Sequence, residues 1–333
     1  MMAIILSMVI SFFTTYFITP YLIRFLRAVG VVGLDLHKKN KPLLPSSGGI
    51  CVASGILAGL LSYIGINTFV SHTADFNMPL LATISSILLV TFVGLIDDLN
   101  VKSRRRGDIR VGIPQWVKPL ITLPAAIPLM VLNAGVATMS VPFIGEINFG
   151  ILYPLILIPI AVVGASNMVN MLGGFNGSES GMGIVYFLGL GIFAALKGNF
   201  SNIIFLISFA ALLAFIKYNW TPAKILPGDS LTYLMGSVVA AGIIVGNMEK
   251  IGVILMIPFF IEFLLKLRSR FRAKSTGILA KDGTIESRYG GRIYSLTHFV
   301  MMFGRLKEKQ ITIALILIEL AFTILIFIPG IVY

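Results

Sequence analysis

Long apolar stretches, each about as long as a membrane-crossing helix, recur from one end of the chain to the other. A helix needs about 20 predominantly apolar residues to cross the hydrocarbon core of a bilayer. The composition agrees, because 57% of the 333 residues are hydrophobic and 12% are charged, whereas soluble domains carry about 25% charged residues. The sequence therefore predicts an all-α polytopic membrane protein with about ten transmembrane helices, at 3–24, 48–70, 79–96, 118–135, 150–168, 181–196, 202–217, 231–247, 251–267 and 311–331.

The distribution of basic residues agrees with this number of helices. With ten spans, alternate loops lie on opposite sides of the membrane. All but two of the 26 lysines and arginines, Lys197 and Lys250, then lie in or beside the loops of one side. Cytoplasmic loops are enriched in Lys and Arg, so we expect these loops in the cytosol and both termini outside. The net charge of +12 is then explained by this topology and by contact with anionic lipids of the bilayer, without a nucleic-acid partner.

The chain is expected to form one integral-membrane domain, 1–333. Its last cytosolic loop contains ILAKDGTIES, in which short β-prone runs flank Asp282-Gly283, so we predict a small β-hairpin there. Glu262 and Glu319 are the acidic residues that fall within spans, and we expect both to reach the membrane interface from near a helix end. Almost every unusual polar residue lies in the cytosolic loops at 24–47, 97–118, 167–181, 217–230 and 266–310.

The segment GLIDDLN places two adjacent carboxylates, Asp97 and Asp98, at the cytosolic end of the third span. Neighbouring carboxylates at a membrane surface repel each other and lose hydration, so they need a cationic partner. The structural alternative is a solvated helix end, but the helix macrodipole disfavours carboxylates at a C-terminus. A functional role is therefore the favoured interpretation.

The stretch NMVNMLGGFNGSESG follows a nearly all-apolar run and carries Asn167, Asn170, Asn176 and Glu179. Asn167 and Asn170 lie three residues apart, so they share a face if the segment is helical. An amide offers an oxygen ligand to a hard cation and two donors to a base, and glycines let the backbone approach a ligand closely. Helix capping by Asn in a polar turn is the structural alternative, but four polar groups exceed what capping requires.

Two further cytosolic segments contribute polar residues. Asp229, in LPGDS, directly precedes the eighth span and is either its N-cap or a ligand for a divalent metal. In RSRFRAKS, the residues Arg268, Arg270, Arg272 and Lys274 either anchor the helix at the interface or bind a pyrophosphate. Together, the Asp, Asn and basic residues on one face of the membrane predict a site for Mg²⁺, or Mn²⁺ in its place, and a phosphorylated, nucleotide-like substrate.

In order along the chain, LIDD, NMVNMLGGFNG, YNWTPAKILPGDS and the arginine-rich last loop resemble the polyprenyl-phosphate N-acetylhexosamine-1-phosphate transferase family (glycosyltransferase 4 family). Its members are ten-helix membrane enzymes that move a sugar 1-phosphate from a UDP-sugar to a polyprenyl phosphate. Bacterial members that build peptidoglycan precursors carry a TDGLDG-like sequence where this chain has LGGFNG, and a His-rich final loop that is absent here. The resemblance therefore points to the eukaryotic and archaeal UDP-GlcNAc:dolichyl-phosphate GlcNAc-1-phosphotransferase, and the compact loops favour an archaeal protein.

The resemblance implies roles for residues of this chain in metal binding and catalysis. Asn170 and Asp229 resemble the Mg²⁺ ligands of the family, and Lys118 resembles the lysine that contacts the pyrophosphate. Asp97 and Asp98 resemble the paired aspartates, which we group with Lys118 as catalytic residues. Whether Asp98 acts as a base or through position and charge is open.

The resemblance also implies which residues bind the substrate. Asn176 resembles the uridine contact, and Arg272 resembles the arginine over the diphosphate and sugar. Asn167, Glu179 and Arg270 are predicted to bind the UDP-sugar as well.

The expected reaction is attack of dolichyl or another polyprenyl phosphate on the β-phosphorus of UDP-GlcNAc, with UMP leaving, as the first membrane step of N-glycan or related glycan assembly. Phe271 replaces a His of the eukaryotic loop, so another UDP-acetamido sugar or a cell-wall polymer pathway is an alternative. A membrane transporter is the alternative from another class, but transporters bind near the bilayer midplane, whereas these polar residues collect on one face. The oligomeric state is open, a homodimer included.

Overall fold

The structure is a computed structural model that describes residues 1–100, 113–141 and 145–329. It is mostly helical. Short π-helical turns, η1 (Asn67–Ser71) and η3 (Tyr153–Leu157), and a 3₁₀ turn, η2 (Leu123–Ala126), adjoin the α-helices. The α-helices are α1 (Met2–Ala28), α2 (Gly49–Ile66), α3 (Asn77–Asn100), α4 (Lys118–Thr122), α5 (Ile127–Val131), α6 (Ile158–Met171), α7 (Ser178–Leu196), α8 (Asn202–Asn219), α9 (Gly228–Gly246), α10 (Glu249–Leu255), α11 (Ile257–Arg268), α12 (Leu296–Met301) and α13 (Glu308–Leu325).

Helices occupy all ten predicted spans. In the described residues, seven helical segments are long and apolar enough to cross a membrane: Met2–Ala28, Gly49–Ser71, Asn77–Leu99, Tyr153–Met171, Ser178–Leu196, Asn202–Asn219 and Gly228–Gly246. Of the three other spans, those at 118–135 and 251–267 are interrupted, and α13 carries three charged residues, Glu308, Lys309 and Glu319. The span at 118–135 is divided into α4, η2 and α5 at Pro124 and Pro128, because proline lacks the N–H that a helix interior needs. The predicted class, an all-α polytopic membrane protein, is confirmed.

In the part of the chain that the structure describes, three pairs of short antiparallel strands connect the helices. They are β1 (Val32–Leu34) with β2 (Leu43–Pro45), β3 (Thr138–Val141) with β4 (Gly145–Asn148), and β5 (Ile278–Leu279) with β6 (Ile285–Glu286). The last pair confirms the predicted hairpin: its turn contains Gly283 at φ +85°, and the Asp282 carboxylate accepts a hydrogen bond from the Thr284 N–H. The other two pairs were not predicted.

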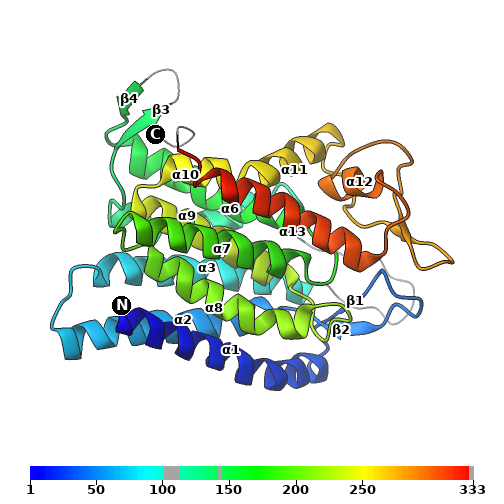
Figure 1. Cartoon of the computed structure of the whole chain (residues 1–333), viewed down its shortest axis with the longest axis horizontal. Helices are drawn as coiled ribbons and strands as arrows, with labels where there is room; N and C mark the ends of the chain where they lie inside the picture. Colours follow the sequence, from blue (N-terminus) through cyan, green and yellow to red (C-terminus); the bar gives the residue numbers. More distant parts are fainter. Residues whose placement is uncertain (101–112, 142–144, 330–333) are drawn as a thin grey trace.

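The long helices lie side by side, and successive segments run in opposite directions (Figure 1). The N-terminus and the C-terminal end of α13 lie at one end of the bundle, together with β3 and β4. The pair β1–β2 and the segment with α12 lie at the opposite end, which we call the loop end. The predicted active-site loops meet there, although part of the loop at 97–118 falls outside the described residues.

Helix α9 lies at the centre of the bundle, with 89% of its span buried. It packs against α3 and α6, which carry predicted site residues. Small residues permit this packing: a Cβ added to Gly94 of α3 would lie 2.5 Å from the Cα of Ser230 in α9. This close approach brings the C-terminal end of α3 against the N-terminal end of α9.

The prediction that Glu262 and Glu319 reach the interface is wrong, because both side chains are 0% exposed. Glu319 lies within α13, which packs against α7. Its side chain is therefore directed into the protein and not toward the membrane surface. Glu262 lies in α11, 3.5 Å from the ammonium of Lys266.

Candidate active site

Two cavities adjoin each other at the loop end. We call them chamber A, of about 340 Å³, and chamber B, of about 240 Å³. Asn170, Met171 and Asp229 line both, so the C-terminal end of α6 and the N-terminal end of α9 form their junction. Chamber A is also lined by Asp35, Asp98, Phe175, Asn176 and Glu179, and chamber B by Gln115, Lys118, Asn167, Lys266 and Phe271.

Asp98 caps the N-terminus of α9 from the neighbouring helix α3. Its Oδ1 accepts the Asp229 N–H at 2.8 Å, and its Oδ2 accepts the Ser230 N–H at 3.2 Å and the Ser47 hydroxyl at 2.7 Å. The first N–H groups of a helix have no partner within the helix and favour negative charge. Gly228, at φ +68°, leaves room for the carboxylate, because a Cβ there would lie 2.4 Å from Asp98 Oδ2. Asp98 thus fixes the start of α9 and, with it, Asp229.

Lys118 lies between two carboxylates. Its Nζ is 2.6 Å from Asp97 Oδ2 and 2.6 Å from Asp229 Oδ2. The other oxygen of Asp97, Oδ1, accepts the Ile113 N–H at 2.9 Å. The predicted need for a cation beside the paired aspartates is therefore met within the chain. The three charges come from α3, α4 and α9, three separate segments of the sequence.

The two asparagines of α6 have different partners. Asn170 Nδ2 donates to Asp229 Oδ2 at 3.3 Å, and its Oδ1 accepts the Thr232 hydroxyl at 2.7 Å. Asn167 Nδ2 donates to Thr122 Oγ1 and to the Val163 carbonyl oxygen. Asn170 therefore belongs to the junction of the chambers, whereas Asn167 connects α6 to α4 in the wall of chamber B.

Asn176 and Glu179 shape the glycine-containing turn between α6 and α7. Glu179 Oε1 accepts the Gly174 N–H at 2.8 Å, and its Oε2 accepts the Ser178 hydroxyl at 2.5 Å. Asn176 Nδ2 donates to Asp35 Oδ2 at 2.9 Å. Both predicted residues line chamber A, and Glu179 also holds the turn in place.

Four residues that the sequence analysis did not select lie next to Asn176. The Asn176 N–H donates to Glu308 Oε1 at 3.2 Å, and Lys38 forms an ion pair with Glu308 and lies 3.6 Å from Asp35 Oδ2. His37 stacks on the ring of Phe175 with centroids 4.4 Å apart, and burial lowers the pKa of His37 to about 4. No motif marks these positions, since they become neighbours only when the β1–β2 segment and the start of α13 meet the turn.

Arg270 and Arg272, predicted to bind substrate, lie on the turn that follows α11. Their side chains are exposed, and neither lines a chamber. Phe271, between them, does line chamber B. Their role in substrate binding stays a prediction.

The chemistry of the donors at the junction suits a hard divalent cation. Asp229 and Asn170 supply a carboxylate and an amide oxygen, and Mg²⁺ is usually held by one or two carboxylates together with substrate phosphates. In the described residues, no three His, Cys, Asp or Glu side chains are grouped to hold an ion by themselves. The amide of Asn170 points its Nδ2 at Asp229, so it must turn over to place its oxygen beside that carboxylate. The residues therefore fit an ion that takes its other ligands from a bound phosphate.

Sequence comparison places the chain among known proteins. The model of glycosyl transferase family 4 matches residues 80–247. A protein of Saccharolobus solfataricus is 36% identical over 97% of this chain and 96% of its own length, and one of Sulfolobus acidocaldarius is 32% identical over 98% and 95%. Both have the provisional name UDP-N-acetylglucosamine–dolichyl-phosphate N-acetylglucosaminephosphotransferase.

A third relative, from Dictyostelium discoideum, has the same name without that qualification. It is 24% identical over 92% of this chain and 83% of its own length.

The region matched by the family model, 80–247, contains the residues that surround the junction of the two chambers: Asp97, Asp98, Lys118, Asn170 and Asp229. The chain has membrane-crossing helices, this polar junction and relatives that match along nearly its whole sequence. It belongs to glycosyl transferase family 4.

Proposed function

We propose that this enzyme transfers N-acetylglucosamine 1-phosphate from UDP-GlcNAc to dolichyl or another polyprenyl phosphate, giving GlcNAc-diphospho-dolichol and UMP. This is the reaction in the names of the relatives from Saccharolobus and Dictyostelium. The observation that carries the proposal is the junction at which chambers A and B share Asn170 and Asp229, with Lys118 beside them. Such a junction can hold a diphosphate between a nucleoside on one side and an acceptor phosphate on the other.

The reaction is a phosphoryl transfer. An oxygen of the lipid phosphate attacks the β-phosphorus of UDP-GlcNAc and forms a new P–O bond. The bond from that phosphorus to the bridging oxygen breaks, and UMP leaves with the electron pair. Because the second pKa of a phosphate monoester is about 6, the acceptor is mostly dianionic at neutral pH and needs no proton removed.

The side chains at the junction serve this reaction by position and charge. The Lys118 ammonium neutralises negative charge that builds up on the phosphate oxygens, and we expect Arg270 and Arg272 to add to it when substrate binds. Asp229 and Asn170 would hold Mg²⁺, or Mn²⁺ in its place. When bound, this ion supplies positive charge to the diphosphate oxygens. Asp98 acts through α9, because its oxygens accept three hydrogen bonds from Ser47, Asp229 and Ser230.

The side of the membrane follows from the basic residues. Lysines and arginines concentrate in the loops at the loop end, as in cytoplasmic loops. We therefore place the chambers at the cytosolic face and both termini outside. UDP-GlcNAc reaches this face from the cytosol. The lipid phosphate reaches it at the headgroup level, while its polyprenyl chain stays in the hydrocarbon.

One observation favours a different sugar as the alternative. Phe271, where the eukaryotic enzyme has a His, lines chamber B, so an apolar ring replaces a hydrogen-bonding one in the wall of that chamber. Another UDP-acetamido sugar, in N-glycan or cell-wall polymer assembly, would use the same phosphoryl transfer.

The assignment is tested with purified protein in nanodiscs, Mg²⁺, dolichyl phosphate and a panel of UDP-sugars. We expect labelled UMP to exchange into UDP-GlcNAc only when lipid phosphate and Mg²⁺ are both present, and mass spectrometry to detect the GlcNAc-diphospho-lipid. UDP-GalNAc as the preferred donor would replace the sugar assignment but keep the chemistry. Absence of exchange with every donor would refute the enzymatic function.

Replacement of Asp98 with Asn separates its two possible roles. The amide NH₂ cannot accept the hydrogen bonds that reach Asp98, and each unsatisfied buried group costs about 1–3 kcal/mol. We expect the start of α9 to shift and kcat to fall about 100-fold, equivalent to about 2.7 kcal/mol, equally at every pH between 6 and 9. A recovery of Asp98→Asn activity as the pH rises would instead identify Asp98 as a base. Ser47→Ala, which leaves the carboxylate in place, should cost much less.

A further inference from the structure

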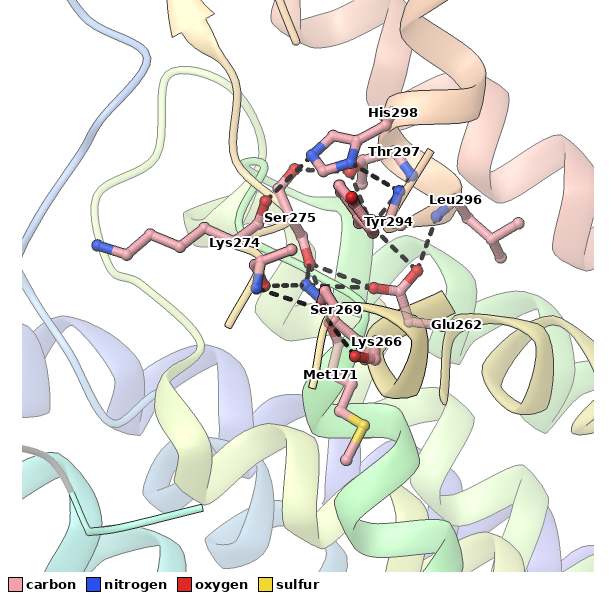
Figure 2. Close-up of polar contacts among 12 residues, drawn as sticks. Met171, Glu262, Lys266, Ser269, Lys274, Ser275, Tyr294, Leu296, Thr297 and His298 are labelled. Carbon is pink, nitrogen blue, oxygen red and sulfur yellow. Dashed lines mark hydrogen bonds and ion pairs between the residues drawn. The ribbon is translucent and has the colours of Figure 1, made fainter. Parts of the chain in front are cut away.

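A buried polar network lies in α11 and the segment that follows it, outside the junction of the two chambers (Figure 2). Its centre is the ion pair between Glu262 and Lys266, whose side chains are 0% and 8% exposed. Removing two charges from water costs more than their attraction returns unless further hydrogen bonds satisfy them. A membrane helix that keeps such a pair therefore needs partners for it.

The partners all come from the polar segment after α11. Glu262 Oε2 accepts the Ser295 hydroxyl at 3.0 Å and the Leu296 N–H at 2.7 Å. Lys266 Nζ donates to the Ala273 carbonyl oxygen at 2.9 Å and to Ser275 Oγ at 2.7 Å. The ion pair thus holds both ends of the segment between residues 273 and 296, as Figure 2 shows for Ser275 and Leu296.

Lys266 also holds the turn that carries the two arginines. Arg270 and Phe271 have φ values of +53° and +59°, a left-handed conformation that is strained for residues other than glycine. The Lys266 carbonyl oxygen accepts the Phe271 N–H at 2.8 Å and the Ser269 N–H at 3.0 Å. Lys266 therefore holds the turn through its backbone carbonyl group, and its ammonium holds Ala273 and Ser275, which follow the turn.

The network touches the wall of both chambers. Ser275 Oγ lies 3.1 Å from the carbonyl oxygen of Met171, the last residue of α6 and the neighbour of Asn170. Ser275 lines chamber A, and Lys266 and Phe271 line chamber B. A displacement of Ser275 or Lys266 is thus transmitted directly to the junction.

A second layer of contacts makes the network rigid. The Thr297 hydroxyl donates to the Ser275 carbonyl oxygen at 2.6 Å. His298 Nδ1 accepts the Tyr294 N–H, so the proton is on Nε2, which donates to the Lys274 carbonyl oxygen at 3.0 Å (Figure 2). Burial lowers the pKa of His298 to about 4, which keeps the ring in this neutral form at physiological pH.

We propose that Glu262, Lys266 and Ser275 form a buried clamp that sets the position of the Arg270–Arg272 turn against the junction, and that they are positioning residues for phosphoryl transfer. The inference rests on the proposed function, because the turn acts on the phosphates of the UDP-sugar. We expect the uridine end to be held by other residues in chamber A, which is lined by Asn176, the predicted uridine contact. Loss of the clamp should therefore lower kcat and leave the KM for UDP-GlcNAc nearly unchanged.

The test variant is the double replacement Glu262→Gln/Lys266→Met. It removes both charges together, so no buried charge is left unpaired and the bundle should still fold. We expect kcat for GlcNAc-lipid formation to fall about 30-fold, since a displacement of about 1 Å can cost up to about 100-fold. The KM for UDP-GlcNAc should change less than about threefold, and amide hydrogen exchange should rise in residues 268–276 but not in the long helices.

Two comparisons complete the experiment. Lys281→Met removes an exposed lysine from the hairpin of the same segment and should leave kcat and hydrogen exchange at 268–276 unchanged. Ser275→Ala should reproduce part of the kcat loss, because it removes the oxygen that links Lys266 to Met171.

The outcomes separate the clamp from the proposed function. A double variant with unchanged kcat, or one whose long helices also lose protection, overturns the positioning role. If the wild type transfers no sugar phosphate, the proposed function fails, and unchanged exchange at 268–276 in the double variant then overturns the clamp independently.

Discussion

Lys118→Met is expected to lower the kcat for GlcNAc-lipid formation about 1,000-fold, the upper range for loss of one charge-stabilising group in an enzyme. The lysine lies 2.6 Å from both Asp97 Oδ2 and Asp229 Oδ2. Without it, the two carboxylates repel each other and the phosphates lose a cation. Steady-state assays in nanodiscs measure the effect, with the thermal midpoint recorded for each variant.

A matched control uses Lys224, an exposed lysine between α8 and α9 that lines neither chamber. Lys224→Met makes the same chemical change at the loop end and should retain full activity. A Lys118→Met enzyme within tenfold of the wild type would show that Lys118 only balances Asp97 and Asp229 and does not act on the phosphates.

Asp229→Asn should also lower kcat/KM about 1,000-fold, because it removes the carboxylate shared by both chambers and one of the two proposed metal ligands. An amide is a weaker ligand than a carboxylate, so the Mg²⁺ concentration for half-maximal activity should rise at least about tenfold. Titrations with Mg²⁺ and Mn²⁺ measure this shift. Asp75→Asn, an exposed aspartate between α2 and α3, is the control.

An unchanged Mg²⁺ requirement in Asp229→Asn would remove this residue from the metal site. The double variant Lys118→Met/Asp229→Asn gives a further check. Since the two side chains form one ion pair, their effects should not add. The double variant should therefore lose far less than the product of the two single losses.

Much of the fold could be predicted from hydrophobic length and charge. Apolar runs located helices at all ten predicted positions, and Asp282-Gly283 located one hairpin, because both signals are local. The interruption of the span at 251–267 by Met256 was not predicted, although Pro258, in the first turn of α11, lacks the N–H that would continue α10. The inward position of Glu319 was missed for another reason: which face of α13 meets α7 is decided by packing.

The site was predicted in part, and the family in full. The motifs identified Asp98, Asn170 and Asp229, and in the fold Asp229 is hydrogen-bonded to each of the other two. The sequence could not show that Asp98 caps α9, because the partners lie about 130 positions apart in the chain. Asp35 and Glu308 were missed since each is an isolated acidic residue in a loop or helix start, without a motif around it.

The contact between Gly94 and Ser230 makes the distance between two helix ends a determinant of the chemistry. Any side chain at position 94 would push α3 and α9 apart, withdraw the carboxylate of Asp98 from the helix end that it holds, and tilt Asp229 out of line. A genetic screen for inactive alleles should therefore recover changes at position 94, which faces α9 and lines neither chamber. Their defect would originate in the spacing of two helices.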